Sequence, residues 1–570
     1  MEMDGADRRR AHATSPHPHA PTSVRAHVVP AAWQGSLNNA DPEKRIIRGC
    51  ACLGTFIGEA DFVHRSLAEK VREGREGIDT LVEMDDTDRI KTSLQSASIL
   101  LRWCANVQYN SIMRTTPPSL ASGAAAVHDD RVTQALVDMN QLMSDAQGVM
   151  AQDQARLPLR MGGLGFSRLS DLSAPSYVGS LAGCFATMSR LVPSLRGIDL
   201  AAVDAVEGAQ DTRGPPMLVE AADALARLRG TWERARREYA AVSDDPVDMR
   251  ADGLAARQLP SVELPEEESL PRLAEFADAD APANRHAQKH LSGAVHACNW
   301  LDWREAARQQ SVRDAVRSTE VTSEESGAAF STLPHVTGID SHTYRAMVQR
   351  RLGVEISQLR GVAGSGSALL RGVAVDPFGD AAVNISAEHS ARHGAVVRAW
   401  HRACKAAFGS AVRAEHAAHE RYSPRKRPDV TVFNEGENGG ATHLLLEVKT
   451  LSSLSSKGKA KFPSSEHVLL GGIAQEKAKV VERDYQGALA RKHTVVALLH
   501  SSFGALDPTA TRLLSRLDAK VKSRLPDPGS APWTARSFRQ LHAQSITTAV
   551  QLAAARQVLA AASNAFDGSP

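Results

Sequence analysis

A short hairpin in the C-terminal third of this 570-residue chain constrains its fold more than any other stretch. Residues 428–433 are rich in β-branched side chains, residues 434–440 (NEGENGG) have the composition of a turn, and residues 442–450 form an apolar run of strand length. Two such runs on either side of a glycine-rich turn predict an antiparallel pair of strands. The sequence therefore predicts a β-hairpin, and with it a sheet.

The charges on this hairpin are its unusual feature. Because side chains alternate between the two faces of a strand, Glu447 and Lys449 share a face with Leu445. Burying such charges among leucines costs free energy unless they are compensated. A divalent cation held by Asp429 and Glu447 would compensate them, and Lys449 would orient or deprotonate an attacking water. The pattern favours a metal-dependent nuclease; the alternative is a solvated hairpin whose charges pair with each other.

Helical and strand-like segments flank the hairpin. Residues 392–410 carry apolar side chains at helical spacing, and residues 473–492 form a second amphipathic pattern. Residues 494–500 (TVVALLH) are typical of a buried strand. The predicted order of helix, hairpin, helix and strand indicates an α/β domain with a small mixed sheet.

Composition places this domain in a larger and mainly helical protein. A chain of 570 residues is too long for one core, and 42% hydrophobic with 23% charged residues is ordinary for globular proteins. The start, MEMDGADRRR, has no apolar signal core, and the six cysteines are scattered, which favours a reducing intracellular compartment. No stretch is long and apolar enough to cross a bilayer. We expect no membrane association.

Composition also divides the chain into five predicted segments. They are a disordered tail (1–42), a helical bundle (43–200), a helical connector (201–384), the α/β domain (385–525) and a C-terminal helical extension (526–570). Within the bundle, one helix is expected to run through residues 132–150.

The hairpin resembles the PD-(D/E)xK restriction-like nuclease superfamily. In that superfamily, the acid of the PD motif, the acid of the ExK motif and its lysine lie at one hydrolytic centre. The matching residues here are Pro428-Asp429 and Glu447-Val448-Lys449. The resemblance implies that Asp429 and Glu447 bind Mg²⁺ or Mn²⁺ and that Lys449 is the third catalytic residue.

A second resemblance is to the part of non-LTR retrotransposon reverse transcriptases that follows the catalytic palm. Four segments keep the order and approximate spacing of that family: LGTFIG (53–58), RTTPP (114–118), LPLRMGGLGF (157–166) and APSY (174–177). The resemblance implies that residues 43–200 are thumb-like. It also implies an intracellular, nuclear protein of retroelement origin.

Weaker matches continue toward the nuclease-like domain. FSTLP (330–334) and RRLG (350–353) resemble the family's connector, DPFGD (376–380) and Arg392-His393 resemble segments around its Cys/His knuckle, and FGAL (503–506) resembles the segment after the last core strand. No cysteine lies between residues 361 and 393. Zinc is therefore not expected, and residues 201–384 are interpreted as a connector with a degenerate knuckle.

The chain also departs from the family at the polymerase. Glu83-Met84-Asp85-Asp86 superficially imitates the catalytic turn of a reverse transcriptase, but it follows the LGTFIG segment instead of preceding it and lacks the aromatic residue. Ala381 stands where the family has the knuckle histidine. We expect a truncated protein without the polymerase palm and without reverse transcriptase activity.

Basic residues around the hairpin indicate a nucleic-acid substrate, because contacts to phosphates supply affinity without sequence readout. The predicted nucleic-acid-binding residues are Arg392, His393, Arg425, Lys426, Arg427, Lys457, Lys459 and Lys461. The resemblance implies DNA as the substrate, with RNA as a further candidate partner. Glu415 and Glu420 are further candidates for the metal site.

Two other functions stay open at this point. A catalytically inactive relic of a reverse transcriptase would bind nucleic acid in a salt-dependent way and give no metal-dependent product. A helical interaction protein would bind no DNA even at low salt.

Overall fold

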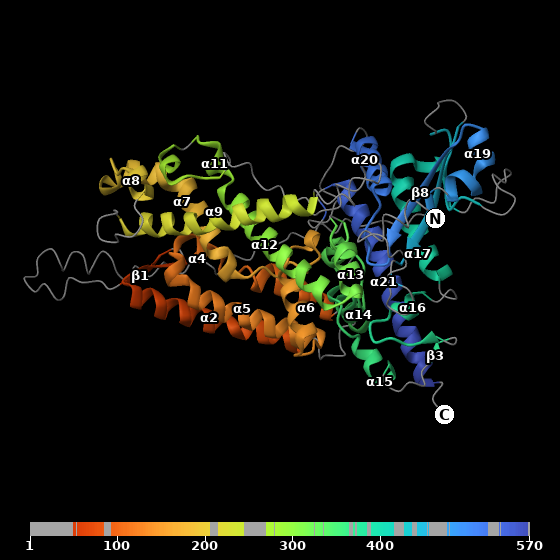
Figure 1. The fold of residues 1–570 in the computed structure, drawn as a ribbon, viewed down its shortest axis with the longest axis horizontal. Coiled ribbons are helices and arrows are strands. Elements are labelled where there is room, and N and C mark those ends of the chain that lie inside the picture. The colour runs from red at the N-terminus through yellow and green to blue at the C-terminus, as the bar shows by residue number, and fades with distance from the viewer. Residues whose placement is uncertain are drawn as a thin grey trace, which may run out of the picture.

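The computed structural model describes most of the chain after the predicted tail. The described residues are 49–52, 54–84, 93–205, 215–243, 270–278, 280–323, 325–334, 336–363, 369–370, 373–384, 389–414, 427–435, 442–452, 454, 476–477, 479–522, 535 and 537–567. Most of them are helical, and a small mixed sheet of four strands lies toward the C-terminal end (Figure 1). A mostly helical chain with such a sheet is what the sequence predicts.

The first part of the described chain is a hairpin followed by a bundle of helices. Strand β1 (Gly49–Cys52) pairs with antiparallel β2 (Thr55–Gly58). The helices are α2 (Ala60–Glu83), α3 (Ser93–Leu100), α4 (Asn110–Thr115), α5 (Pro118–Asn140), α6 (Ala146–Arg156) and α7 (Leu169–Leu191). Helix α2 buries Val63, Leu67 and Val71, which recur every four residues, and this stripe packs with α5 (Figure 1).

The prediction of one helix through residues 132–150 is wrong, because parts of two helices occupy this stretch. Helix α5 ends at Asn140, and Gln141 has a left-handed backbone with φ of 52°. Helix α6 begins after Asp145, whose carboxylate accepts the backbone N–H of Gly148 at 2.8 Å. The apolar spacing continues across the break, so periodicity alone concealed this N-cap.

A second group of helices packs against α7 of this bundle. Its elements are α8 (Leu200–Ala205), α9 (Pro216–Ser243), α11 (Pro282–Arg285) and α12 (Ala287–Gln310). Leu181 of α7, Leu225 of α9 and Leu291 of α12 share one buried core. None of the described helices is long and apolar enough to span a membrane.

Short elements then lead to the sheet. They are α13 (Val312–Val321), α14 (Ser341–Leu352), α15 (Arg360–Ala363), β3 (Leu369–Leu370), β4 (Val373–Ala374) and α16 (Asp380–Asn384). The N-cap of α14 is Asp340, which accepts the N–H of Thr343, and its C-cap is Gly353 with φ of 75°. A Cβ at Gly353 would lie 2.2 Å from the Arg317 guanidinium, so this position needs glycine for space as well as for its left-handed backbone.

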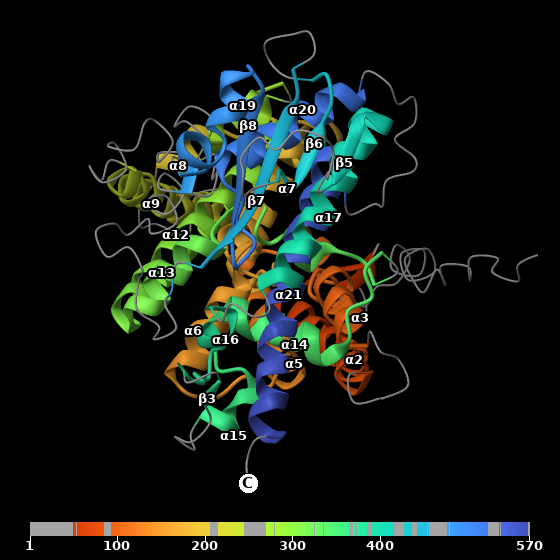
Figure 2. The ribbon, with the colours of Figure 1, turned by 90° about the vertical axis from the view of Figure 1, so that its right-hand side faces the viewer.

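The sheet has the order β5 (Val412–Ala414), β6 (Val430–Val432), β7 (Leu444–Leu451) and β8 (Thr494–Ser501). The first three strands are antiparallel, and β8 runs parallel to β7. The pairing of β6 with β7 confirms the predicted hairpin. Both faces are covered, by α17 (His389–Phe408) and α20 (Pro508–Lys522) on one side and by the π-helical turn Lys479–Asp484 with α19 (Gln486–Ala490) on the other (Figure 2).

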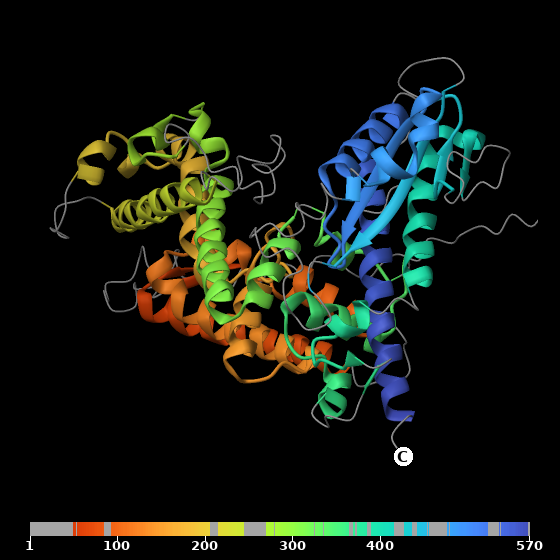
Figure 3. The ribbon, with the colours of Figure 1, turned by 45° about the vertical axis from the view of Figure 1, so that its right-hand side comes forward.

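The C-terminal helix α21 (Phe538–Asp567) belongs to two cores at once. Near its start, Ile546 and Val550 pack in the core of α17 and the sheet. Farther along, Ala554 and Val558 pack in the core of α5, α6 and α14. Figure 3 shows this long blue helix running from the sheet past the helical region to the C-terminus. The predicted extension therefore contributes to the packing of both parts of the protein.

Four buried arginines, which we name the arginine junction, hold segments that are far apart in the sequence; they are Arg313, Arg317, Arg350 and Arg351. Arg351 donates to the carbonyl oxygens of Leu159 at 2.8 Å and Gly163 at 3.1 Å. Arg350 donates to the carbonyl oxygen of Ser502 at 2.9 Å, just after β8. The LPLRMGGLGF, RRLG and FGAL segments thus meet at one place.

Candidate active site

The predicted acidic pair comes from neighbouring parts of the hairpin. Val430, the first residue of β6, is paired with Leu446, the residue before Glu447. Asp429 lies just before β6; its backbone N–H donates to the carbonyl oxygen of Leu446 at 3.0 Å, and its carboxylate accepts the N–H of Val448, the residue after Glu447. The hairpin therefore brings Asp429 against the two residues that flank Glu447.

Alternation along β7 divides its side chains as predicted. Leu444, Leu446 and Val448 pack in the core with α17. Leu445 packs on the other face against Tyr485 and Ala488. The two-residue period therefore puts Glu447 and Lys449 on the face that α19 covers.

Asp429 is held at the end of strand β6 by two donors. Its Oδ2 accepts the backbone N–H of Val448 at 2.6 Å. Val448 lies beyond the part of β7 that pairs with β6, so the carboxylate satisfies this N–H in place of a strand partner on that side. Its Oδ1 lies 2.9 Å from Nε2 of His393, which comes from the first turns of α17. The side chain is 11% exposed. These contacts fix the carboxylate in one orientation beside Glu447.

Glu447 is also buried, and an aromatic hydroxyl supports it. Tyr485 precedes α19 and donates its hydroxyl to Oε2 of Glu447 at 2.7 Å. Burial, followed by the charge of Glu447, raises the pKa of Tyr485 well above its usual value, so the phenol stays protonated and keeps donating. Tyr485 therefore orients the carboxylate of Glu447 through this hydrogen bond.

Lys449 is the third member of the motif, and its ammonium group contacts a second acid. Its Nζ lies 2.9 Å from Oε2 of Glu476, and its side chain is 18% exposed. Burial alone would raise the pKa of Glu476, but the hydrogen bond and charge of Lys449, helped by Lys479, outweigh it and lower that pKa. The contact with Glu476 thus orients the Lys449 side chain, which lies two residues along β7 from Glu447.

A buried histidine supports the strand that carries the motif. The Nε1–H of Trp400 in α17 donates to Nε2 of His500 at 2.7 Å, and Nδ1 of His500 donates to the carbonyl oxygen of Lys449 at 3.0 Å. Because Nε2 accepts from Trp400, the two bonds together require the neutral ring with its proton on Nδ1. Burial lowers the pKa of His500 to about 4, against the weaker opposing effects of the Lys449 carbonyl and Asp507.

The predicted phosphate-binding residues are only partly within the described chain. Arg392 is buried in α17, where it donates to the carbonyl oxygen of Val383 at 3.1 Å and to Gln557 at 3.3 Å. His393 faces Asp429, and Arg427 is exposed just before it. The other candidates, Arg425, Lys426, Lys457, Lys459 and Lys461 together with Glu415 and Glu420, lie outside the described residues, as do Asp85 and Asp86.

The donor set fits a hard divalent cation. Among the described residues, no cluster of three or more His, Cys, Asp or Glu side chains is arranged to hold a metal ion. Zinc sites need three or four protein ligands, whereas Mg²⁺ uses one or two carboxylates together with water and substrate phosphates. Asp429 and Glu447, two buried carboxylates in the same hairpin, are therefore a suitable pair for Mg²⁺ or Mn²⁺.

Sequence reasoning missed Tyr485, Glu476 and His500. All three lie in segments that were predicted as a helix or a strand, but nothing in their spacing connects them with the motif. A polar side chain in an otherwise apolar strand was the available signal for His500, which ends the run TVVALLH. The contacts of Tyr485 and Glu476 depend on how the helix lies on the sheet.

Comparisons with known proteins identify no relative. No protein-family model matches the chain, and neither the curated proteins nor the solved structures contain a match. The arguments for function therefore depend on the geometry described above.

Proposed function

We propose that this protein is a metal-dependent nuclease that hydrolyses phosphodiester bonds in DNA. The observation that carries the proposal is the hairpin contact in which the carboxylate of Asp429 accepts the N–H of Val448, the residue between Glu447 and Lys449. The mixed sheet with helices on both faces agrees with the α/β arrangement of the PD-(D/E)xK superfamily that the motif resembles.

A bound Mg²⁺ or Mn²⁺ would lower the pKa of a coordinated water and polarise the phosphate. The residues around this metal ion would have separate roles. Asp429 and Glu447 would be the ligands, held in place by Val448 N–H and by the Tyr485 hydroxyl. Lys449, paired with Glu476, would place a positive charge beside the phosphate and orient the attacking water.

The proposal includes a retroelement origin. Its support is the order of the LGTFIG, RTTPP and LPLRMGGLGF segments and the later RRLG and FGAL segments. In this interpretation the helical region of residues 43–200 is thumb-like. The nuclease proposal stands on the hairpin and does not need this origin.

The test is nicking of supercoiled plasmid by the full chain, because α21 packs in both cores and the sheet domain is not separable from the rest. Wild-type protein with Mg²⁺ or Mn²⁺ is expected to give open circles, and chelation is expected to stop the reaction. Asp429→Asn and Glu447→Gln should each slow nicking at least about 100-fold, since a metal supplies several kcal/mol of transition-state stabilisation.

Glu73→Gln is the matched control, because Glu73 is an exposed glutamate on α2. This variant should nick at the wild-type rate. Nicking that survives in both Asp429→Asn and Glu447→Gln would show that another site, or a contaminant, cuts the plasmid.

One observation favours the second candidate function, a nucleic-acid-binding protein without hydrolysis. Both oxygens of Asp429 already have partners, in His393 and in Val448 N–H. Salt-dependent DNA binding by the wild type, without nicking in Mg²⁺ or Mn²⁺, would select this alternative.

A further inference from the structure

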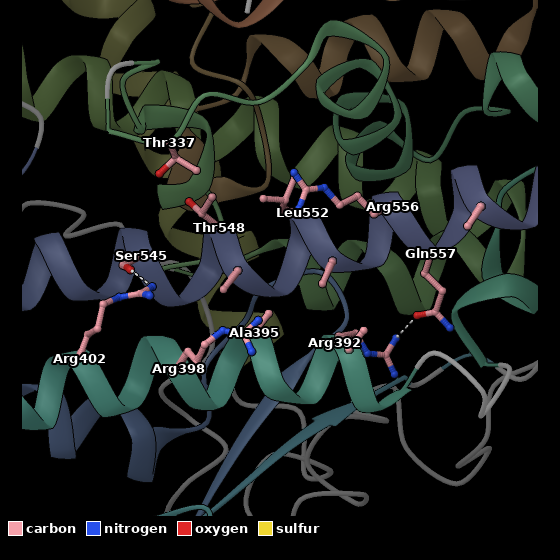
Figure 4. Close-up of a pocket in the computed structure, with 14 residues that line it drawn as sticks. Thr337, Arg392, Ala395, Arg398, Arg402, Ser545, Thr548, Leu552, Arg556 and Gln557 are labelled. Atoms are coloured by element: carbon pink, nitrogen blue, oxygen red, sulfur yellow. Dashed lines mark hydrogen bonds between the residues drawn. The ribbon is translucent and has the colours of Figure 1, made fainter. Parts of the chain in front are cut away.

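A basic pocket lies between α17 and α21, away from the carboxylate pair. Its volume is about 510 Å³. Four arginines line it, Arg392, Arg398 and Arg402 from α17 and Arg556 from α21, and no acidic residue does (Figure 4). Such a concentration of one charge needs a counter-charge from outside.

The pocket is elongated because the two helices run alongside each other. Arg392 contacts Gln557 at one end, and Arg402 contacts Ser545 at 3.4 Å at the other (Figure 4). Ten residues of helix separate Arg392 from Arg402, so the pocket extends over about 15 Å. That length covers about four nucleotides of one strand in a duplex, at a rise of about 3.4 Å each.

The lining of the pocket combines small side chains with exposed arginines, as a groove that binds a nucleic-acid backbone requires. Small side chains, including Ala395, Ala549 and Ala553, form the floor and leave room for a chain. Arg398 and Arg556 are exposed and form no ion pair with any described residue. Arg402 is exposed as well, and among the described residues its side chain bonds only to Ser545, at 3.4 Å. The guanidinium groups are therefore available to an anionic ligand.

The positive field also affects neighbouring histidines. Burial, followed by the charge of Arg402, lowers the pKa of His542 to about 4. Burial, Lys405 and Arg402 lower the pKa of His401. Both rings thus stay neutral at neutral pH and add no further charge of their own. The arginines, which remain charged at all ordinary pH values, carry the attraction.

We propose that this groove binds the phosphodiester backbone of nucleic acid through Arg398, Arg402 and Arg556. Arginine suits phosphate because its planar fork donates two parallel hydrogen bonds. Much of the lining between the arginines is alanine, and Gln557 already bonds to Arg392 and to the carbonyl oxygen of Ala382, so we expect binding to depend little on sequence. Adjacent residues connect it with the candidate active site, since Arg392 lines the groove and His393 contacts Asp429.

The test is equilibrium binding of the full chain to a labelled duplex DNA of about two helical turns in EDTA, so that hydrolysis plays no part. The groove variant is Arg398→Gln/Arg402→Gln/Arg556→Gln. The control variant, Arg65→Gln/Arg72→Gln/Arg75→Gln, removes three exposed arginines from α2 and lowers the net charge equally. Both sets of substitutions are at exposed positions on helices, where glutamine is tolerated.

We expect the groove variant to bind at least about tenfold more weakly. The slope of log affinity against log salt should fall by about two to three, because each phosphate that an arginine no longer neutralises removes about 0.9 from it. The control should keep the wild-type slope, and an unrelated duplex sequence should bind equally well. An equal weakening in both variants, or none in the groove variant, would overturn the proposal. Because no metal is present, binding can be confirmed even if the nuclease proposal fails.

Discussion

The arginine junction and the carboxylate pair both bury charge, but they neutralise it differently. In the junction, Arg313 lies 2.8 Å from Asp380, and Arg317 lies 3.3 Å from Asp314. In the carboxylate pair, Asp429 accepts from a peptide N–H and contacts a histidine ring, and Glu447 accepts from a phenol. Lys449, the cation of the motif, contacts Glu476.

The difference shows which charges serve folding and which are placed for chemistry. Burial lowers the pKa of Arg351 to about 9 and that of Arg317 to about 10, so both remain charged at neutral pH, and their donors go to backbone carbonyls of distant segments. Such bonds hold a tertiary structure. The carboxylates of Asp429 and Glu447 are instead buried with a peptide N–H, a histidine ring and a phenol among their partners, an arrangement that suits the binding of a cation.

The largest expected effect is loss of stability at the junction. Arg313→Met leaves Asp380 buried without its closest cation, and breaking a buried pair in this way costs about 3–5 kcal/mol. Urea unfolding followed by circular dichroism measures it. The exposed control Arg72→Met should change the free energy of unfolding by less than about 0.5 kcal/mol.

The same unfolding measurement on Glu447→Gln tests the other side of the comparison. Glutamine keeps the shape of the side chain and still accepts from Tyr485, so the free energy of unfolding should fall by less than about 1 kcal/mol. A decrease as large as that of Arg313→Met would mean that Glu447 serves the fold in the same way as the junction.

The contrast also explains how much could be predicted from the sequence. The hairpin, the alternation along β7, the helix beginning near Arg392 and the strand after Thr494 follow from apolar spacing within about ten residues, and they are present in the structure. The carboxylate pair is a consequence of the same local pattern. It could therefore be located without knowing the rest of the fold.

The junction could not be located in this way, because its bonds join distant segments. Arg351 and Leu159 are 192 residues apart, and Arg350 and Ser502 are 152 apart. The resemblance to family motifs singled out these segments, but nothing in the sequence indicated that they contact each other in the fold. The role of Tyr485 could not be predicted for a related reason, because its contact with Glu447 depends on how a helix packs across the sheet.

His500 lies between the two regions and should make stability depend on pH. An unfolded histidine takes up a proton near pH 6.5, whereas folded His500 does so only near pH 4. The unfolded chain therefore binds more protons between these values, and stability falls as the pH is lowered through this window. The decrease due to this residue approaches about 1.4 kcal/mol per pH unit, or about 2 kcal/mol between pH 6.5 and 5.

The measurement is the free energy of unfolding from about pH 7.5 to 5 in the wild type and in His500→Gln. Other, partly buried histidines, including His296 and His542, also have a pKa lowered to about 4, so the wild-type slope contains several contributions. The variant should lack the part that belongs to His500 and show a shallower slope. Identical slopes would mean that His500 does not titrate differently in the folded chain.

Tyr485→Phe should have a small effect on stability, and it sharpens the comparison most. Phenylalanine keeps the ring in the core with Leu445 and Ala488 but removes the donor to Glu447, so stability should change by only about 1 kcal/mol. Removing partners of this kind typically weakens metal affinity by about 10–100-fold. We therefore expect the Mg²⁺ concentration for half-maximal nicking to rise about tenfold, with the rate recovering at saturating Mg²⁺. A merely structural tyrosine would lower the rate at every Mg²⁺ concentration, through loss of folded protein, and would leave the half-maximal concentration unchanged.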